Sequence, residues 1–392
     1  MTRELTGKMV GSQKQTTSRW AWDAVLAGLS RDDAADRLVE RLDGFVEWPA
    51  LLQESRADRL TPLVYAGLKQ ALRDGAKVPG QYLQAFQRET MRAGVRLAYL
   101  EEAYERIVDR ADGAGIPILV LKGLALAATV YPPGIPRPMD DIDLLVRETD
   151  RERLAEILRA QGYRNDLRGE EDFFHPSRMF SVDVHTAPVN VTRIPARRAL
   201  WPVTFDKLWE RHRTFKVGDN LLHTLGPLDT ALHLATHAVH HHGLAGRLWM
   251  VDLLLCMEKW PLTIDTLGAA APSAHRSLWY CLQALALQGL DFSPDIRTHI
   301  QPQRLHPGEQ RILAAASQGK LPEAIRYGFT FLCLPGIRSR AGFLRQILFP
   351  QRDMYRRGFA DTGGVTPRWI SYWQMAAGLA TKTIAVGFRR HT

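Results

Sequence analysis

Two aspartates separated by one residue draw attention first, because their side chains can share an ion. Asp141 and Asp143 lie in DDIDLLV, residues 140–146, where acidic residues precede an apolar run. If this segment is a strand, its period of two puts both carboxylates on one face, and Ile142 and Asp140 on the other. Neighbouring carboxylates repel each other unless a cation lies between them, and such oxygen ligands suit Mg²⁺. The spacing therefore predicts a divalent-cation site.

A second acidic segment has a similar alternation. MFSVDVHT, residues 179–186, places Asp183 and His185 on one face of a strand and two valines on the other. Together with residues 172–176 it predicts a β-hairpin, with residues 176–178 in the turn. A downstream strand is expected near Thr204 or over residues 214–217.

Phosphate-binding groups are expected just before the first acidic strand. Residues 116–121 form an apolar run, interrupted by a proline, that suits a buried strand. It ends at Lys122-Gly123, before a short helix over residues 124–131, and amides at a helix N-terminus attract anions. Arg137 could make bidentate phosphate contacts. The alternatives are a surface lysine at 122 and a loop ion pair at 137.

These segments resemble a known superfamily. A strand, a glycine-bearing turn, a helix and a strand with acidic residues at i and i+2 are similar to the polymerase-β-type nucleotidyltransferases. LKGLAL, the arginine in RPMDDIDLLV and the later VDVH resemble more closely a bacterial branch described as uncharacterised nucleotidyltransferases. The turn Lys122-Gly123 departs from the usual Gly-Ser or Gly-Gly of the superfamily but agrees with this branch.

The resemblance implies transfer of a nucleoside monophosphate from a nucleoside triphosphate, driven by two Mg²⁺ ions, with Mn²⁺ as a substitute. Asp141 and Asp143 would bridge both ions. Asp183 would match the third carboxylate, bind the catalytic ion, and accept or orient the proton of the attacking hydroxyl. The residues expected to hold the triphosphate or to line its site are Lys122, Gly123, Arg137, His185, His237, His241 and Arg247.

A histidine-bearing helix is predicted further along, in DTALHLATHAVHHH. His233, His237 and His241 are spaced i, i+4, i+8 and so share one helical face. The branch also has such a helix, followed by the pattern that Arg247 and Asp252 match here. The histidines could line the site opposite the catalytic sheet, hold a structural zinc ion, or be polar surface. Arg247 and Asp252 could instead pair with each other.

Composition suits a globular protein of the reducing cytosol. The 392 residues are 45% hydrophobic and 24% charged, and three widely spaced cysteines argue against a disulfide framework. The first twenty residues lack the apolar stretch of a signal peptide, and no run is long enough for a membrane span. We therefore expect a cytoplasmic location.

The positive charge is concentrated near the C-terminus. From residue 331 onward ten basic residues face two aspartates, so this part carries +8 of the net +9. Such a patch can meet RNA, an acidic partner, a membrane surface or the triphosphate, or it can be a solvated face. Residues 369–388, apolar and aromatic, could form an interfacial helix or a helix packed on the protein.

The pattern as a whole predicts an α+β protein: a small mixed or antiparallel nucleotidyltransferase sheet flanked by helices. Residues 1–95 form an N-terminal helical region with a long helix beginning at residue 81. Residues 96–218 form the catalytic domain, and residues 219–392 a helical domain with the basic tail. From Leu221 onward only helices are expected.

Three functional hypotheses follow. The first is a nucleotidyltransferase whose acceptor is a small molecule, a peptide or a protein. The second is an enzyme that nucleotidylates RNA or tRNA, as toxin-like relatives of the superfamily do. The third is a scaffold that binds nucleotide without turnover, although the presence of all three carboxylates argues against it.

Overall fold

The computed structural model describes residues 21–29, 34–45, 47–165, 172–175, 180–191, 194–268, 272–291, 293–305, 307–316 and 325–349. The hairpin turn expected at residues 176–178 and the aromatic segment over residues 369–388 lie outside these ranges. So does most of the basic tail, of which Arg338, Arg340 and Arg345 are described. Within the described part, no helix combines the length and apolar character needed to cross a bilayer.

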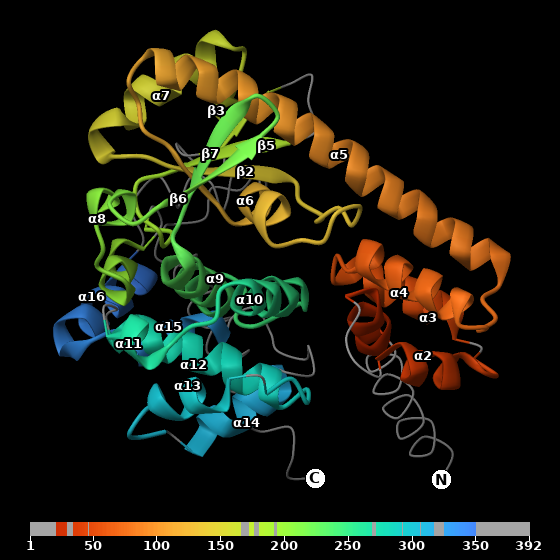
Figure 1. Cartoon of the computed structure of the whole chain (residues 1–392). Helices are drawn as coiled ribbons and strands as arrows, with labels where there is room; N and C mark the ends of the chain where they lie inside the picture. The colour runs from red at the N-terminus through yellow and green to blue at the C-terminus, as the bar shows by residue number, and fades with distance from the viewer. Residues whose placement is uncertain are drawn as a thin grey trace, which may run out of the picture. The chain divides into compact units, whose positions relative to one another are not determined.

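The chain forms two compact units, each assembled from several segments. One comprises residues 1–106, 123–141 and 246–255, and the other residues 107–122, 142–245 and 256–392. A seven-stranded sheet and many helices make up the fold (Figure 1), so the α+β class expected from the sequence is confirmed.

The sheet is mixed, with strand order β3-β4-β5-β2-β1-β7-β6. β1 pairs antiparallel with β2 and parallel with β7, and β4 pairs antiparallel with β5. The predicted hairpin and the strand over residues 214–217 are thus confirmed, and Thr204 instead caps a short helix. The strands are β1 (Leu119–Leu121), β2 (Asp141–Leu145), β3 (Arg164–Asn165), β4 (Asp172–Phe174), β5 (Ser181–His185), β6 (Arg213–Val217) and β7 (Asn220–Thr224).

β7 corrects the expectation that only helices follow Leu221. Val217 pairs with Asn220, so Gly218 and Asp219 form a two-residue hairpin loop. Gly218 has φ +58°, which such turns require and glycine adopts without a steric penalty. This Gly-Asp turn was the overlooked signal, because the two leucines that follow suit a helix and a strand equally well.

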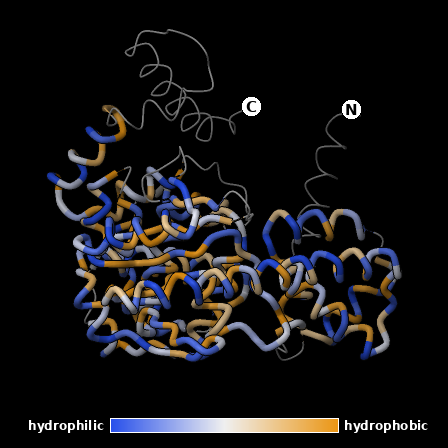
Figure 2. Tube along the Cα trace, turned by 90° about the horizontal axis from the view of Figure 1, so that it is seen from above, coloured by the Kyte–Doolittle hydropathy of each residue, from blue (hydrophilic) through white to orange (hydrophobic). Residues whose placement is uncertain are grey.

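Most of the structure outside the sheet is helical. Helices in Figure 2 carry both hydrophobic and hydrophilic stretches, as amphipathic helices do. The predicted long helix is confirmed as α5. The helices are α2 (Ala34–Leu42), α3 (Trp48–Ala57), α4 (Thr61–Arg73), α5 (Gly80–Gly113), α6 (Lys122–Thr129), η1 (Glu148–Asp150), α7 (Arg151–Ala160), η2 (Pro195–Leu200), α8 (Phe205–Trp209), α9 (Pro227–His240), α10 (Leu248–Lys259), α11 (Ile264–Leu267), α12 (Pro272–Ala286), α13 (Pro294–His299), α14 (Pro307–Ala316), α15 (Ile325–Cys333) and α16 (Gly336–Leu348).

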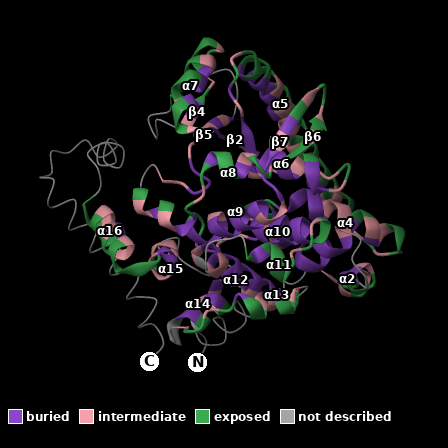
Figure 3. Ribbon diagram, turned by 60° about the vertical axis from the view of Figure 1, so that its left-hand side comes forward, coloured by how far each residue is buried: buried purple, intermediate pink, exposed green. Residues whose placement is uncertain are grey.

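α9 is the central helix of the sheet-bearing unit. It packs mainly on α12 and also on α15. Most of the described residues of α9 and α12 are buried, whereas α16 exposes much of its surface (Figure 3). The predicted histidines therefore sit on a helix that the surrounding core holds in place.

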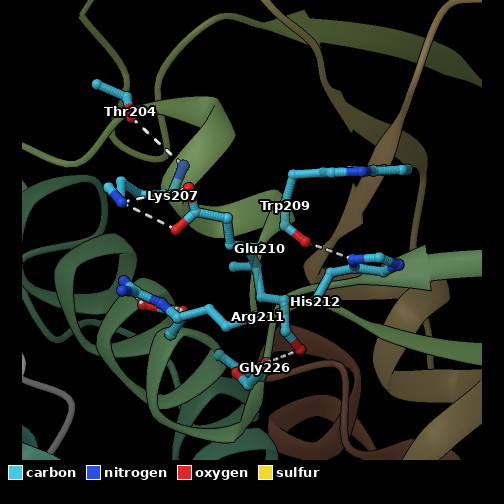
Figure 4. A network of polar contacts seen from close by, with 10 residues as sticks. Thr204, Lys207, Trp209, Glu210, Arg211, His212 and Gly226 are labelled. Atoms are coloured by element: carbon cyan, nitrogen blue, oxygen red, sulfur yellow. Dashed lines mark hydrogen bonds and ion pairs between the residues drawn. The ribbon is translucent and has the colours of Figure 1, made fainter.

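The N-terminal end of α9 is anchored by the segment that precedes β6 (Figure 4). Arg211 forms a bidentate pair with the buried Asp229 of α9, in which Nη2 lies 2.8 Å from Oδ1. A Cβ at Gly226, the residue before α9, would lie 2.5 Å from the carbonyl oxygen of Arg211, so only glycine fits there. These contacts fix where α9 begins.

A buried histidine on α9 makes stability depend on pH. His240 hydrogen-bonds Thr330 (3.0 Å) and Ser277 (2.8 Å) through its two ring nitrogens. Burial, with Arg197 nearby, lowers the pKa of His240 well below its ordinary value of 6.5. Below pH 6.5 His240 binds a proton in the unfolded chain but stays neutral in the folded protein. Stability should therefore fall on acidification, by about 1.4 kcal/mol per pH unit for this residue.

Urea unfolding between pH 7 and pH 4 checks this expectation. His240→Gln should flatten the pH dependence by about one proton, whatever its stability at pH 7. His299→Gln, on the exposed end of α13, should leave the dependence as in the wild type. Equal slopes for His240→Gln and the wild type would contradict the prediction.

Candidate active site

A cluster of two carboxylates and an imidazole lies on the sheet. Asp143 comes from β2, and Asp183 and His185 come from β5, the next strand. Each side chain offers one ligand atom, and the three atoms lie within 4.8 Å of one another. His185 Nε2 is 2.9 Å from Asp143 Oδ1. The alternation expected for MFSVDVHT puts Asp183 and His185 on one face of β5, and the place of β5 beside β2 in the sheet brings them to Asp143.

Lys122 lies against this cluster. Its Nζ is 2.7 Å from Asp143 Oδ1, and Leu121, the residue before it, pairs with Asp143 in the sheet. Lys122 has φ +44°, a conformation rarely adopted by residues other than glycine. Such strain persists only where surrounding structure enforces it, and it often marks functional sites. Here the positive φ of Lys122 lets the chain turn from β1 into α6 while its ammonium group remains in contact with Asp143.

The charges of this cluster depend on one another. Burial alone would raise the pKa of Asp143, but Lys122 and His185 together hold it well below its ordinary value of 3.8. Burial alone would lower the pKa of His185, yet its contact with Asp143 raises it above 6.5. A buried carboxylate whose pKa is strongly shifted by specific charged partners is a candidate functional group.

A further carboxylate lies beside Asp183, and the spacing of the acidic residues did not single it out. Asp172 of β4 is the direct cross-strand partner of Asp183. Like charges directly opposite each other destabilise a sheet unless positive charge offsets them. A three-residue turn at residues 176–178, as the sequence suggested, would set Asp172 against Val182, so the pairing of Asp172 with Asp183 differs by one residue from that expectation.

Other predicted residues belong to the compact unit of residues 1–106, 123–141 and 246–255. Asp141 is the first residue of β2. A Cβ at Gly123 would lie 3.1 Å from Met139 Sδ and 3.3 Å from Arg137 Nη1, so the guanidinium group approaches this backbone closely. Arg247 pairs with Asp58, and its Nη2 lies 3.4 Å from Glu54 Oε2.

Arg137 is held by a buried ion pair. Its Nη2 and Nε lie 2.6 and 2.9 Å from the two carboxylate oxygens of Asp252. Tyr131 donates a hydrogen bond of 2.8 Å to the same carboxylate, and burial, with Asp252, raises its pKa well above 10.0. Asp252 therefore positions Arg137 with Nη1 beside Gly123.

The histidines of α9 share one face, as their spacing predicts. The rings of His233 and His237 lie 6.2 Å apart and those of His237 and His241 4.8 Å apart, nearly parallel in both pairs. His233 is buried and hydrogen-bonds the carbonyl oxygen of Pro188 at 2.8 Å. Burial, with Lys122 nearby, lowers the pKa of His233 to about 3, so this ring is neutral at pH 7.

The geometry gives the lysine a measurable structural role. Lys122→Met should cost about 2 kcal/mol of stability, because Asp143 keeps His185 but loses the ammonium group. Asp143 has a lowered pKa, so the stability from this pair is present above pH 3.8 and lost as the pH falls further. The difference in the free energy of unfolding between Lys122→Met and the wild type should therefore be constant from pH 7 to about pH 4 and decrease below it.

Chemical denaturation across this pH range measures the difference. Lys207→Met removes an exposed lysine paired with Glu210 on α8 and should change little. A Lys122→Met variant as stable as the wild type at pH 7 would contradict the assigned contact.

The fold and the site together define a class. A strand, a turn, a helix and a strand with acidic residues, set in a mixed sheet whose next strand adds another carboxylate, is the arrangement expected of nucleotidyltransferases. The chain belongs to the family described as uncharacterised nucleotidyltransferases, whose profile matches residues 45–334. No curated protein and no solved structure matches the chain.

Proposed function

We propose that the protein is a Mg²⁺-dependent nucleotidyltransferase acting on a nucleoside triphosphate. The acceptor's hydroxyl oxygen forms a bond to the α-phosphorus, the bond to the β-phosphate oxygen breaks, and pyrophosphate leaves. The observation that carries the proposal is the gathering of Asp143, Asp183 and His185 ligand atoms within 4.8 Å, beside Lys122.

The donor set fits a divalent ion. Carboxylate oxygens suit Mg²⁺ and Mn²⁺, and the low pKa of Asp143 keeps one of them ionised and ready to bind. We propose that Asp141 and Asp143 of β2 and Asp183 of β5 hold two ions. When bound, these ions would neutralise the charge of the phosphates and that of the attacking and leaving oxygens.

The chain's own groups have three further roles in this proposal. Asp183 accepts or orients the proton of the acceptor's hydroxyl. The amide of Gly123, at the start of α6, and the ammonium group of Lys122 contact phosphate oxygens. Arg137, fixed by Asp252, offers Nη1 to the phosphate group. The residues that line the binding site are His185, His237, His241 and Arg247. In these roles the side chains position the reacting groups and stabilise their charge, which is how proteins mainly catalyse phosphoryl transfer.

The test is direct labelling. The full chain is incubated with Mg²⁺, each of four α-labelled nucleoside triphosphates and a cell lysate, and the labelled acceptor is isolated. Label transfer that disappears in Asp143→Asn supports the proposal. Binding of nucleotide by calorimetry without transfer to any acceptor would favour the scaffold hypothesis and overturn it.

RNA is a second candidate acceptor, because α16 is basic. Arg338, Arg340 and Arg345 lie on this helix, whose residues include no acidic side chain. Contacts with RNA phosphates weaken steeply as salt rises, so RNA retention should fall between 50 and 200 mM salt. Retention that does not change with salt would remove the support for this acceptor.

A further inference from the structure

Helix α16 exposes several large apolar side chains. The exposed fractions are 84% for Ile337, 44% for Leu344 and 47% for Leu348, and Phe349, directly after the helix, is 71% exposed. These four are among eleven large hydrophobic residues that are exposed in the described part of the chain, so one short helix carries a third of them. Apolar side chains gathered in this way on a surface mark a contact site.

The exposed residues form one stripe along the helix, which we call the apolar stripe: Ile337, Ala341, Leu344 and Leu348. Their spacings of four, three and four residues place them on one face. The other face attaches α16 to the protein. Phe343 is buried there, and the side-chain oxygen of Gln346 accepts a hydrogen bond of 2.9 Å from the amide of Ala196 in η2. The apolar stripe therefore stays on the outer surface (Figure 3).

Positive charge borders the apolar stripe. Arg338 and Arg345 are both exposed, and each follows a residue of the stripe directly, about 100° further around the helix. The third arginine of α16, Arg340, donates a hydrogen bond of 3.1 Å to the carbonyl oxygen of Leu334 instead. The helix contains no acidic residue. A partner that fits this surface combines apolar groups with negative charge.

Anionic lipid meets both requirements, and RNA meets only one. Proteins bind RNA through basic groups on its phosphates and aromatic rings on its bases, so the aliphatic residues of the apolar stripe would be unused. A helix with an apolar face and basic residues lies in the interface of a bilayer. The sequence after α16 has the same character, because residues 350–392 contain seven basic and two acidic residues around an apolar, aromatic segment.

We propose that α16 binds the surface of an anionic lipid bilayer. The side chains of the apolar stripe enter the boundary between headgroups and acyl chains, and Arg338 and Arg345 contact lipid phosphates. With 13 residues the helix lies on the bilayer, because spanning one takes about 20. The inference does not rest on the proposed transfer reaction, whose carboxylates belong to β2 and β5.

Vesicle binding tests the proposal. The full-length protein is sedimented with vesicles of phosphatidylcholine, or of an equal mixture of phosphatidylcholine and phosphatidylglycerol. It should bind the mixed vesicles, and more weakly as salt is added. Ile337→Ser with Leu344→Ser should weaken binding about 100-fold, roughly tenfold for each side chain. Arg338→Gln with Arg345→Gln should weaken it about 25-fold, roughly fivefold for each charge.

Matched controls remove the same groups elsewhere. Ile264→Ser with Leu287→Ser changes two apolar side chains that are 47% and 48% exposed. Arg73→Gln with Lys77→Gln removes two exposed positive charges. Both double variants should bind as the wild type does. So should Asp183→Asn, which keeps the test of lipid binding separate from that of nucleotidyl transfer.

A fluorescent label localises the contact. The three native cysteines, Cys256, Cys281 and Cys333, are buried, so a thiol-reactive, polarity-sensitive dye attaches to Ile337→Cys. Its emission should shift to the blue when mixed vesicles are added, because the label leaves water. The same dye on Leu287→Cys should not shift.

Three results would overturn the proposal. One is the absence of binding to mixed vesicles, including the case in which the arginine pair is needed to retain RNA. Another is an unchanged label at position 337 while the protein binds vesicles. The third is a loss of stability in Ile337→Ser with Leu344→Ser while vesicle binding is unchanged, which would mean that another part of the chain covers the apolar stripe.

Discussion

Replacing Asp183 with asparagine is expected to lower the rate of nucleotidyl transfer by about 10³-fold, the scale of losing one charge-stabilising group in an active site. Asparagine keeps the shape of the side chain but cannot take the proton of the attacking hydroxyl, and it is a weaker ligand for Mg²⁺. Single-turnover measurements with saturating nucleotide separate this loss from weaker binding.

The same variant should not lose stability. Asp172 lies directly opposite Asp183 in the β4–β5 pair, so removing one negative charge relieves a like-charge contact worth a few tenths of a kcal/mol to about 1 kcal/mol. Asp219→Asn, in the exposed β6–β7 turn, is the matched control and should keep full activity. An active Asp183→Asn enzyme would remove the proposed catalytic role.

The second large effect concerns stability. Arg137→Met is expected to cost about 3–5 kcal/mol, because it leaves the carboxylate of Asp252 buried without its cation. Asp252 is only 2% exposed, and Tyr131 alone can offer it a hydrogen bond. Denaturant unfolding measures the loss, and the double variant Arg137→Met with Asp252→Leu should recover part of it, since no charge then stays unpaired.

A surface pair gives the comparison. Arg59 and Asp140 are joined by an ion pair in which both side chains are about half exposed, so Arg59→Met should cost less than about 1 kcal/mol. If Arg137→Met does not fold, Arg137→Lys keeps a positive charge but not the bidentate geometry and should give an intermediate loss. Equal costs for the buried and the exposed pair would contradict the prediction.

The strands that carry the carboxylates could be predicted because their patterns are local. Alternation in DIDLL assigns Asp143 to one face of β2, and alternation in SVDVH assigns Asp183 and His185 to one face of β5. The hairpin brings β4 beside β5. What alternation does not specify is which strand lies next to which. The proximity of Lys122 to Asp143 depends on the pairing of β1 with β2, which a resemblance to the family could suggest but the spacing could not.

Ion pairs between residues far apart in the sequence could not be predicted either. The sequence marked Arg137 and Asp252 as notable, but 115 residues separate them, and no local pattern encodes their buried ion pair. Arg247 likewise pairs with Glu54 and Asp58, which lie more than 180 positions earlier in the sequence. β7 was missed for a different reason: a five-residue strand with two adjacent leucines is ambiguous until the Gly-Asp turn before it is recognised.

The parallel pairing of β1 with β7 has a consequence for how the chain can be cut or made. The hydroxyl of Thr224 bonds the carbonyl of Val120 across 104 residues, so the middle of the sheet stays open during synthesis until β7 has left the ribosome. A truncated piece ending at residue 218 would leave the backbone groups of β1 without a neighbour on that side, ready to pair with another molecule. Fragments meant to stay in solution should therefore extend beyond Thr224.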